Sequence, residues 1–242
     1  MIRAALTFAT AGLLAGLLPA TAAEKKIGTT AVSRNVVQQT GTRDVAIQVG
    51  DDVFSDESVR TGDQSAAKFV FSDETNLALG PTSNVKLDRF VYKGETSYLK
   101  AAVNFTAGAF RFTTGGSDKG AYQLKTSTAT IGVRGTVFDL SVEGGETVIT
   151  LVEGAIDVCP RKNYDGDPRK LSKAQLKAFN CVQLTKVGQT AVVGARRANL
   201  RSTPFSFTDA AGCGDGLCTT TSFAQLSRPG GGGLMCYMKT DQ

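Results

Sequence analysis

The sequence predicts an all-β protein, either a short-stranded β-sandwich or a short β-solenoid of stacked hairpins, with one short helix in an insertion and a low-complexity C-terminal tail. The first reason is a period of two in the large apolar residues, which is typical of strands that bury one face. The second is that turn signals rich in Gly, Asp, Asn and Ser recur about every eight to twelve residues. The apolar runs are Val45–Val49, Phe69–Phe71, Leu77–Leu79, Leu140–Val142 and Val148–Val152.

A weak internal repeat is the third reason. Phe105–Phe112 can be laid over Leu151–Val158, and in each segment a glycine, Gly108 or Gly154, is followed by two alternating apolar residues. A glycine inside a strand pattern is typical of a bend. Two copies favour stacked hairpins that each bury one face, without establishing a regular solenoid.

Residues 1–23 are predicted to be a secretory signal peptide. Arg3 supplies the charged start, an apolar run continues to Leu18, and the small residues 20–23 form a cleavage region. The apolar run is shorter than the roughly 20 residues of a membrane-spanning helix. We therefore expect an exported mature chain, periplasmic or secreted, without a transmembrane span. An uncleaved inner-membrane anchor is the alternative.

The main β-domain is predicted to cover residues 24–195, with its core at 31–158 and a helical excursion at 160–180. Only Leu171–Phe179 shows a convincing helical period, and Ser172 is placed to cap that helix. A helix of this length is not stable alone, so it needs the domain behind it.

Residues 196–242 are predicted to form a largely extended tail. Polar and glycine-rich runs occur at 219–222 and 229–233, and large apolar residues are scattered. Such a segment buries too little apolar surface to offset the entropy of ordering.

The chain has a net charge of +5 that is unevenly distributed. Residues 24–158 contain 14 basic and 17 acidic side chains, whereas residues 159–242 contain 12 and 5. The basic end could face peptidoglycan, lipid phosphate or an acidic protein surface, and nucleic acid is the partner least expected for an exported chain. The simpler interpretation is a solvated basic tail.

The cysteines all lie in the last third of a chain that we expect to reach an oxidising compartment. Cys159 paired with Cys181 would pin both ends of the excursion, and Cys213 could pair with Cys218 or Cys236. One thiol would remain, which makes an intermolecular disulfide an open possibility. A metal site is the weaker interpretation of Cys213 and Cys218, because a tetrahedral zinc site requires a second pair.

Catalysis is not expected. The chain contains no histidine, which removes the usual general base and the commonest transition-metal ligand. Adjacent carboxylates occur at 51–52, 56–57 and 73–74, but all three pairs look like turns and neighbouring strand residues point to opposite faces. Residues 163–167 have the content of a calcium loop but lack its third acidic position and its closing glutamate. We therefore expect no enzyme activity, no cofactor and no metal.

The most informative segment is Thr126–Asp139, which reads TSTATIGVRGTVFD. Gly132 and Gly135 flank Val133 and Arg134, so the backbone there can take a bulged or left-handed geometry. The fold is therefore expected to aim Arg134.

Arg134 has two interpretations. As a structural residue it would pair with a carboxylate such as Asp139 or Glu153 and fix the strand register, which is the interpretation we favour. As a functional residue it would present its planar fork to a partner. The candidate binding residues are then Gly132, Arg134, Gly135 and Thr136.

This segment resembles the signature of the FecR family, whose usual form is close to TPTATIGIRGTxF. Val49–Tyr92 resembles the family's opening half, so the resemblance covers roughly residues 31–158, with Ser127 in place of the usual proline. It implies an all-β periplasmic domain that signals by contact between periplasmic domains, one of them on an outer-membrane receptor. Full-length regulators of this family begin with a cytoplasmic sigma-factor-binding domain and a membrane helix, and we expect neither here.

The expected function is an exported, non-catalytic binding module in cell-envelope sensing or signalling, which contacts a receptor or an inner-membrane sensor. Pairing through an exposed strand edge is the expected mode. The alternative is a structural or ligand-binding envelope protein that adheres to peptidoglycan or an anionic surface polymer. Strongly salt-dependent binding would favour the alternative, and salt-resistant capture of one protein would favour the first function.

Overall fold

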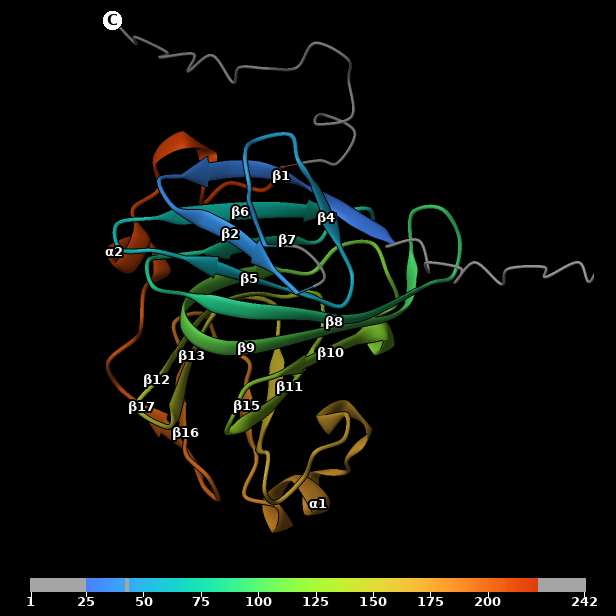
Figure 1. Cartoon of the computed structure of the whole chain (residues 1–242). Coiled ribbons are helices and arrows are strands. Elements are labelled where there is room, and N and C mark those ends of the chain that lie inside the picture. Colours follow the sequence, from blue (N-terminus) through green and yellow to red (C-terminus); the bar gives the residue numbers. More distant parts are fainter. Residues whose placement is uncertain (1–24, 42–43, 222–242) are drawn as a thin grey trace, which may run out of the picture.

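The computed structural model describes residues 25–41 and 44–221, and Figure 1 shows the whole chain. The predicted signal peptide and Cys236 lie outside the described residues. Within the described ranges, no helix is both long and apolar enough to cross a lipid bilayer.

Strands make up about half of the described chain. They are β1 (Lys26–Arg34), β2 (Val37–Thr40), β3 (Val45–Ala46), β4 (Asp52–Phe54), β5 (Glu57–Thr61), β6 (Ala66–Phe71), β7 (Asn76–Leu79), β8 (Asn84–Tyr92), β9 (Tyr98–Thr113), β10 (Tyr122–Lys125), β11 (Ala129–Val133), β12 (Val137–Glu143), β13 (Glu146–Glu153), β14 (Ile156–Pro160), β15 (Val182–Leu184), β16 (Thr190–Val193) and β17 (Ala198–Arg201). The α-helices are α1 (Lys173–Ala178) and α2 (Phe207–Ala211), and short 3₁₀ turns occur at Lys119–Ala121, Pro168–Lys170 and Gly214–Gly216.

Hydrogen bonds join the strands into one mixed sheet that is folded into two layers. Layer A has the order β4-β1-β6-β7-β9-β12-β13-β16-β17. Layer B has the order β3-β2-β5-β8-β9-β10-β11-β14-β15. Only β9 belongs to both layers among the described strands, and its pairing with β10 is parallel.

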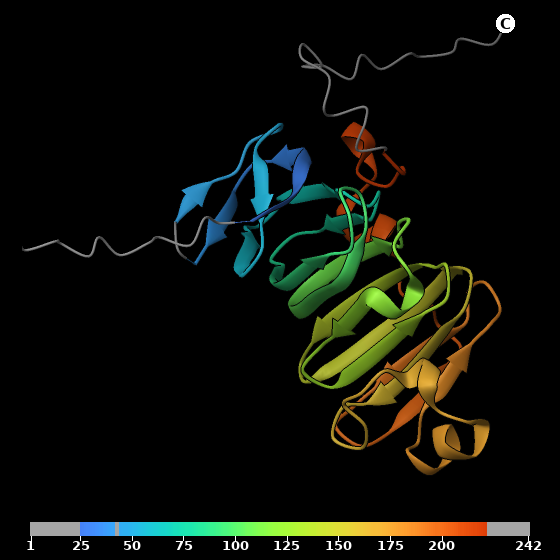
Figure 2. The same cartoon turned by 90° about the vertical axis from the view of Figure 1, so that its right-hand side faces the viewer.

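Consecutive parts of the chain stack along the long dimension of the molecule. Figure 2 shows the colours following one another in sequence order from β1 at one end to the β15–β17 region at the other. Each hairpin therefore packs mainly on its neighbours in sequence. The prediction of an all-β fold of stacked hairpins is confirmed.

The two glycines of the internal repeat lie where the chain passes between layers. At Gly108 (φ +102°) β9 leaves β8 in layer B and joins β12 in layer A. At Gly154 (φ +82°) the chain leaves β13 in layer A and enters β14 in layer B. A Cβ at Gly108 would lie 2.4 Å from the Cα of Ser83, so a larger residue cannot make this crossing without a shift.

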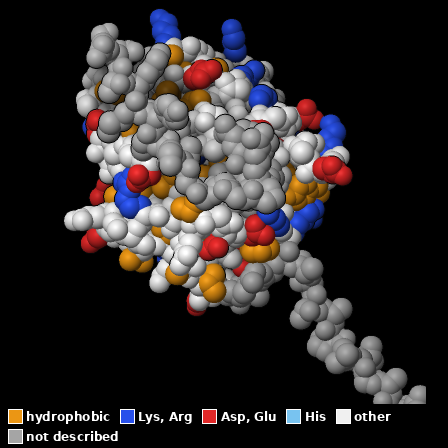
Figure 3. Space-filling view, turned by 90° about the horizontal axis from the view of Figure 1, so that it is seen from above, with side chains coloured by type: hydrophobic (Ala, Val, Ile, Leu, Met, Phe, Trp, Pro, Cys, Tyr) orange, Lys and Arg blue, Asp and Glu red, His pale blue; other side chains and the backbone are white. Residues whose placement is uncertain are grey.

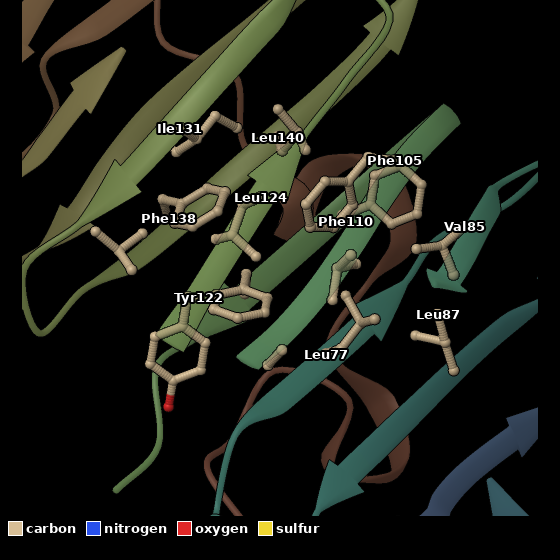
Figure 4. Close-up of a cluster of buried hydrophobic side chains, with 14 of the residues drawn as sticks. Leu77, Val85, Leu87, Phe105, Phe110, Tyr122, Leu124, Ile131, Phe138 and Leu140 are labelled. Atoms are coloured by element: carbon tan, nitrogen blue, oxygen red, sulfur yellow. The ribbon is translucent and has the colours of Figure 1, made fainter. Parts of the chain in front are cut away.

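The core lies between the layers and is filled by the inward-facing half of each strand. Phe105, Phe110 and Phe112 of β9 are almost fully buried, and Phe112 packs on Phe138 of β12 with ring centroids 5.5 Å apart. Figure 4 shows the rings of Phe105, Phe110 and Phe138 beside Leu and Val side chains from both layers. Each buried ring of this size stabilises the fold by ~1.5–3 kcal/mol, so the apolar alternation alone accounts for a cohesive interior without tryptophan.

Residues 202–221 run back across the outer face of layer A, and we call this segment the strap. It contains α2, which lies at the left of Figure 1. Phe207 and Leu217 are buried against small residues of the sheet, namely Val32, Ala66, Ala78 and Ala109. The predicted largely extended tail from residue 196 therefore differs from the structure up to residue 221, because a few apolar contacts and many backbone hydrogen bonds hold the strap down.

The surface seen from above Figure 1 is mixed in character. In Figure 3, acidic and basic side chains are interspersed among small apolar groups around the grey atoms.

Candidate functional site

The Thr126–Asp139 segment passes from one layer to the other. β11 ends in layer B and β12 begins in layer A, so residues 134–136 form a corner, which we call the signature corner. Gly135 has φ +64°, a conformation that favours glycine. Three of the four candidate binding residues lie in this corner, and Gly132 lies just before it in β11.

Thr136 holds the signature corner against the crossing at Gly154. Its Oγ1 donates to the carbonyl oxygen of Ala155 at 2.9 Å and accepts from the backbone N–H of Arg134 at 2.9 Å. A Cβ at Gly154 would lie 2.0 Å from the carbonyl oxygen of Gly135. The two crossings therefore touch backbone to backbone, and this contact requires glycine at 154.

The Arg134 side chain pairs with Asp157 of β14. Nε and Nη2 lie 3.0 and 2.7 Å from Oδ2 of Asp157, whose side chain is 2% exposed while that of Arg134 is 51% exposed. Asp157 also accepts from Nε2 of Gln183 at 2.6 Å. About half of the Arg134 side chain is therefore exposed, although its guanidinium pairs with a buried carboxylate.

The predicted partners of Arg134, Asp139 and Glu153, are wrong. Asp139 is instead engaged by Arg111, and Glu153 is exposed at the end of β13. Antiparallel pairing of β11 with β14 sets Gly132 opposite Asp157, and Arg134 lies on the same side two residues later.

The excursion packs directly over Gly132. A Cβ there would lie 2.8 Å from Cγ of Arg169 and 3.3 Å from Cδ of Pro168. The helix α1 follows, and Ser172 caps it as the sequence predicts. The structure adds that Gln175 completes a capping box. Gly132 is thus explained by packing against the excursion, and it does not itself face solvent.

The weak calcium-loop candidate at 163–167 is occupied by side-chain cations. Asp165 pairs with Lys125 at 2.9 Å and with Arg161 at 3.1 Å, and Asp167 pairs with Arg169 at 2.6 Å. Burial alone would raise the pKa of Asp165, but Lys125 and Arg161 outweigh it and hold the pKa below its usual value. Among the described residues, no group of three or more metal-ligating side chains comes together.

The adjacent carboxylates serve turns and structure. Asp56 and Glu74 have φ +65° and +69°, which fits the predicted turns, whereas Glu57 is buried at the start of β5. Asp73 is also buried and accepts from the hydroxyl of Tyr122 at 2.7 Å. Burial, with the charge of Asp73, raises the pKa of Tyr122, so the phenol stays protonated as a hydrogen-bond donor.

Two disulfides close loops in the described part of the last third. Cys159 pairs with Cys181 across the base of the excursion, and Cys213 pairs with Cys218 within the strap. Both pairs are among the alternatives that the sequence leaves open. The first pins the excursion that covers Gly132.

Arg134→Ala is expected to lower the free energy of unfolding by ~1–2 kcal/mol, because it leaves the buried Asp157 carboxylate with fewer partners. Urea unfolding of the purified mature chain measures this change. Arg89→Ala, at an exposed position of β8, is the control and should change stability by less than ~0.5 kcal/mol. Equal stability of both variants and the wild type would rule out the structural role of Arg134.

The fold and this corner define a β-domain of stacked hairpins. Residues 57–157, from β5 into β14, match the family described as FecR protein. Residues 57–157 of this chain are therefore a FecR domain.

Two crystal structures of a proposed anti-sigma factor from Parabacteroides distasonis are similar to this chain, with 12% and 14% identity and TM-scores of 0.41 and 0.42. Each similarity covers 62% of this chain and 61% of the other, so the chain spans less than two thirds of the length of those proteins. No curated protein matches the chain.

Proposed function

We propose that this protein is an exported, non-catalytic binding module that takes part in cell-envelope sensing or signalling through contact with another protein. The observation that carries the proposal is the FecR domain at residues 57–157. The signal-peptide pattern of residues 1–23 and the two disulfides support export to an oxidising compartment. An envelope receptor or an inner-membrane sensor is the proposed partner.

The edge of β17 is the proposed contact. β17 pairs with β16 and forms the end of layer A. The N–H of Gly194 donates to the carbonyl oxygen of Arg197, so by alternation the backbone groups of Ala198 and Leu200 point away from β16. Leu200 is 60% exposed. An unpaired edge of this kind accepts a partner strand, and an exposed apolar side chain adds contact area.

The exposed part of the Arg134 side chain is a second proposed contact. The side chain is 51% exposed, while Asp157 holds its Nε and Nη2. Gly132, Gly135 and Thr136 position it through the backbone. Bidentate capture of a carboxylate on the partner fits this geometry.

Photocrosslinking in the native cell envelope tests the proposal. A photoreactive phenylalanine derivative is placed at Leu200 in the full chain, and captured species are identified by mass spectrometry. We expect Leu200 to capture one defined receptor or sensor, in a complex that survives high salt. Val49, which is 62% exposed and distant in sequence, is the control and should not capture that protein. Capture of only cell-wall fragments, or of nothing, at Leu200 would overturn the proposal.

Adhesion to an anionic envelope polymer is the second candidate, and one observation favours it. Residues 161–201 contain ten basic and two acidic side chains, and both acidic ones, Asp165 and Asp167, are paired with cations. Lys173 and Lys177 of α1 are exposed, as is Lys186. This end of the molecule therefore presents net positive charge.

Cosedimentation with purified peptidoglycan tests adhesion. If it occurs, the bound fraction should fall at least about tenfold between roughly 0.05 and 0.5 M salt, because surface charges are screened. Lys173→Gln with Lys177→Gln should weaken it, and Lys86→Gln on β8 should not. Salt-independent binding, or none, would exclude this candidate.

A further inference from the structure

The end of the strap is held by its backbone. Nδ2 of Asn76 donates to the carbonyl oxygen of Thr221 at 3.0 Å, and the N–H of Thr221 donates to Oδ1 of Asn76 at 2.9 Å. One amide side chain on the outer face of layer A thus pairs with both backbone groups of one residue, as a neighbouring strand would. This contact does not depend on the side chain at position 221.

Lys68 of β6 holds the same part of the strap. Lys68 is 1% exposed. Its Nζ lies 2.9 Å from the carbonyl oxygen of Gly216 and 2.7 Å from that of Thr219. Oγ1 of Thr221 is a third acceptor. Among the residues that the structure describes, no carboxylate contacts Nζ. Burial accordingly lowers the pKa of Lys68 to about 8.

A buried ammonium with only neutral acceptors is incompletely compensated. The ammonium now donates to neutral oxygens, and a carboxylate acceptor would add the attraction between opposite charges to the hydrogen bond. A segment that carried a carboxylate where the strap has Thr221 would therefore satisfy Lys68 better than the strap does. This face already pairs with one carboxylate, because Nη2 of Arg34 in β1 lies 3.3 Å from Oδ2 of Asp215 in the strap.

We propose that the outer face of layer A around Lys68 and Asn76 binds an extended acidic peptide of a partner protein, and that the strap is its built-in competitor. The partner segment supplies one carboxylate to Arg34 and one to Lys68, and an apolar side chain between them replaces Leu217. Its backbone pairs with Asn76. The inference goes beyond the proposed function, because it concerns a surface separate from the edge of β17.

Competition by the strap sets the affinity of this site. A tethered segment competes at an effective concentration on the order of millimolar. The apparent dissociation constant of the peptide equals its intrinsic value divided by the fraction of molecules in which the strap is released. Loosening the strap should therefore strengthen peptide binding, which a purely structural strap does not predict.

Fluorescence anisotropy with two labelled probes tests the proposal. Both probes copy residues 212–221 with Cys213→Ser and Cys218→Ser, and the acidic probe also carries Thr221→Asp. The proteins are the full mature chain and its Leu217→Ala variant, which weakens the strap. We expect Leu217→Ala to bind the acidic probe about tenfold more tightly than the wild type does, and about tenfold more tightly than it binds the neutral probe.

Lys68→Met in the same Leu217→Ala background should remove the preference for the acidic probe, while Lys86→Met should preserve it. A preference that survives Lys68→Met, equal binding of both probes, or no binding at all would overturn the proposal.

A second measurement uses the wild type, so it tests the proposal even if the Leu217→Ala variant does not fold. An excess of the acidic probe should speed amide hydrogen exchange of residues 214–221, because the displaced strap loses its bonds to Lys68 and Asn76. Unchanged exchange with millimolar probe would overturn the proposal. Both readouts are independent of Leu200 crosslinking, so failure here leaves the proposed function standing.

Discussion

Asp139→Ala is expected to lower the free energy of unfolding by ~3–5 kcal/mol, the cost of removing one partner of a buried ion pair. Asp139 of β12 accepts from Arg111 of β9 through two bonds, Nε at 2.7 Å and Nη2 at 2.9 Å. The side chains are 4% and 18% exposed. Its loss leaves the Arg111 guanidinium buried without its carboxylate.

The same substitution also releases the strap. Oδ2 of Asp139 accepts from the N–H of Phe207 at 2.9 Å, and the guanidinium of Arg111 lies over the Phe207 ring. We therefore expect Asp139→Ala to expose residues 205–221 to proteolysis before global unfolding.

Equilibrium denaturation in urea, followed by limited proteolysis, measures both effects. Asp209→Ala, at an exposed position of α2, is the matched control and should cost about 1 kcal/mol or less. Replacing both members of the pair, as Arg111→Met with Asp139→Leu, should recover much of the loss. A cost for Asp139→Ala as small as that of the control would show that the pair contributes no net stability.

Gly154→Ala is the second large effect, with an expected cost above ~3 kcal/mol or a failure to fold. The residue has φ +82°, where an L side chain is strained by ~1–2 kcal/mol. Its Cβ would also lie 2.0 Å from the carbonyl oxygen of Gly135 and 3.1 Å from the Cα of Thr136. Both contacts are with backbone, so no side-chain rotation relieves them.

Gly188→Ala separates the two causes. Gly188 has nearly the same φ, +81°, and a Cβ there meets nothing within 4 Å. Gly188→Ala should therefore lower the free energy of unfolding only by the backbone strain. Thermal and urea unfolding of the two variants measure the difference between their costs. Equal costs would mean that the two crossings can move apart, and the signature corner would then not depend on a close contact at Gly154.

Much of the fold could be predicted because its causes are local. Alternation of apolar residues indicates which face of a strand is buried. The glycines at 108 and 154 indicate a backbone conformation that other residues avoid. The helix after Ser172 was also predictable, since its cap and its Gln175 partner are three residues apart. For the same reason the signature segment could be located, although its contacts could not.

The partner of Arg134 could not be predicted because it depends on register across 23 residues. As carboxylates, Asp139 and Glu153 could pair with Arg134 as well as Asp157 does. Only the pairing of β11 with β14 brings Asp157 next to the guanidinium. Likewise, the choice of Cys218 over Cys236 for Cys213 depends on how the chain turns within the strap.

The strap could not be predicted because its binding leaves little trace in its own composition. Its end is held by side chains of the sheet, Lys68 and Asn76, that bond to its backbone. Its two apolar anchors are sufficient because alanines on the sheet let it lie close. A polar, glycine-containing segment can therefore be ordered when the complementary residues are elsewhere in the chain.

The path of the strap has a consequence for how the molecule unfolds. A stack of hairpins in which each unit touches only its neighbours can fray from either end, one unit at a time. The strap touches Thr150 of β13 at its start and Arg34 of β1 near its end, and so it ties late units of the stack to the first. Fraying at the amino-terminal end then requires release of the strap as well. The first and the late hairpins of the stack should therefore unfold together rather than one at a time.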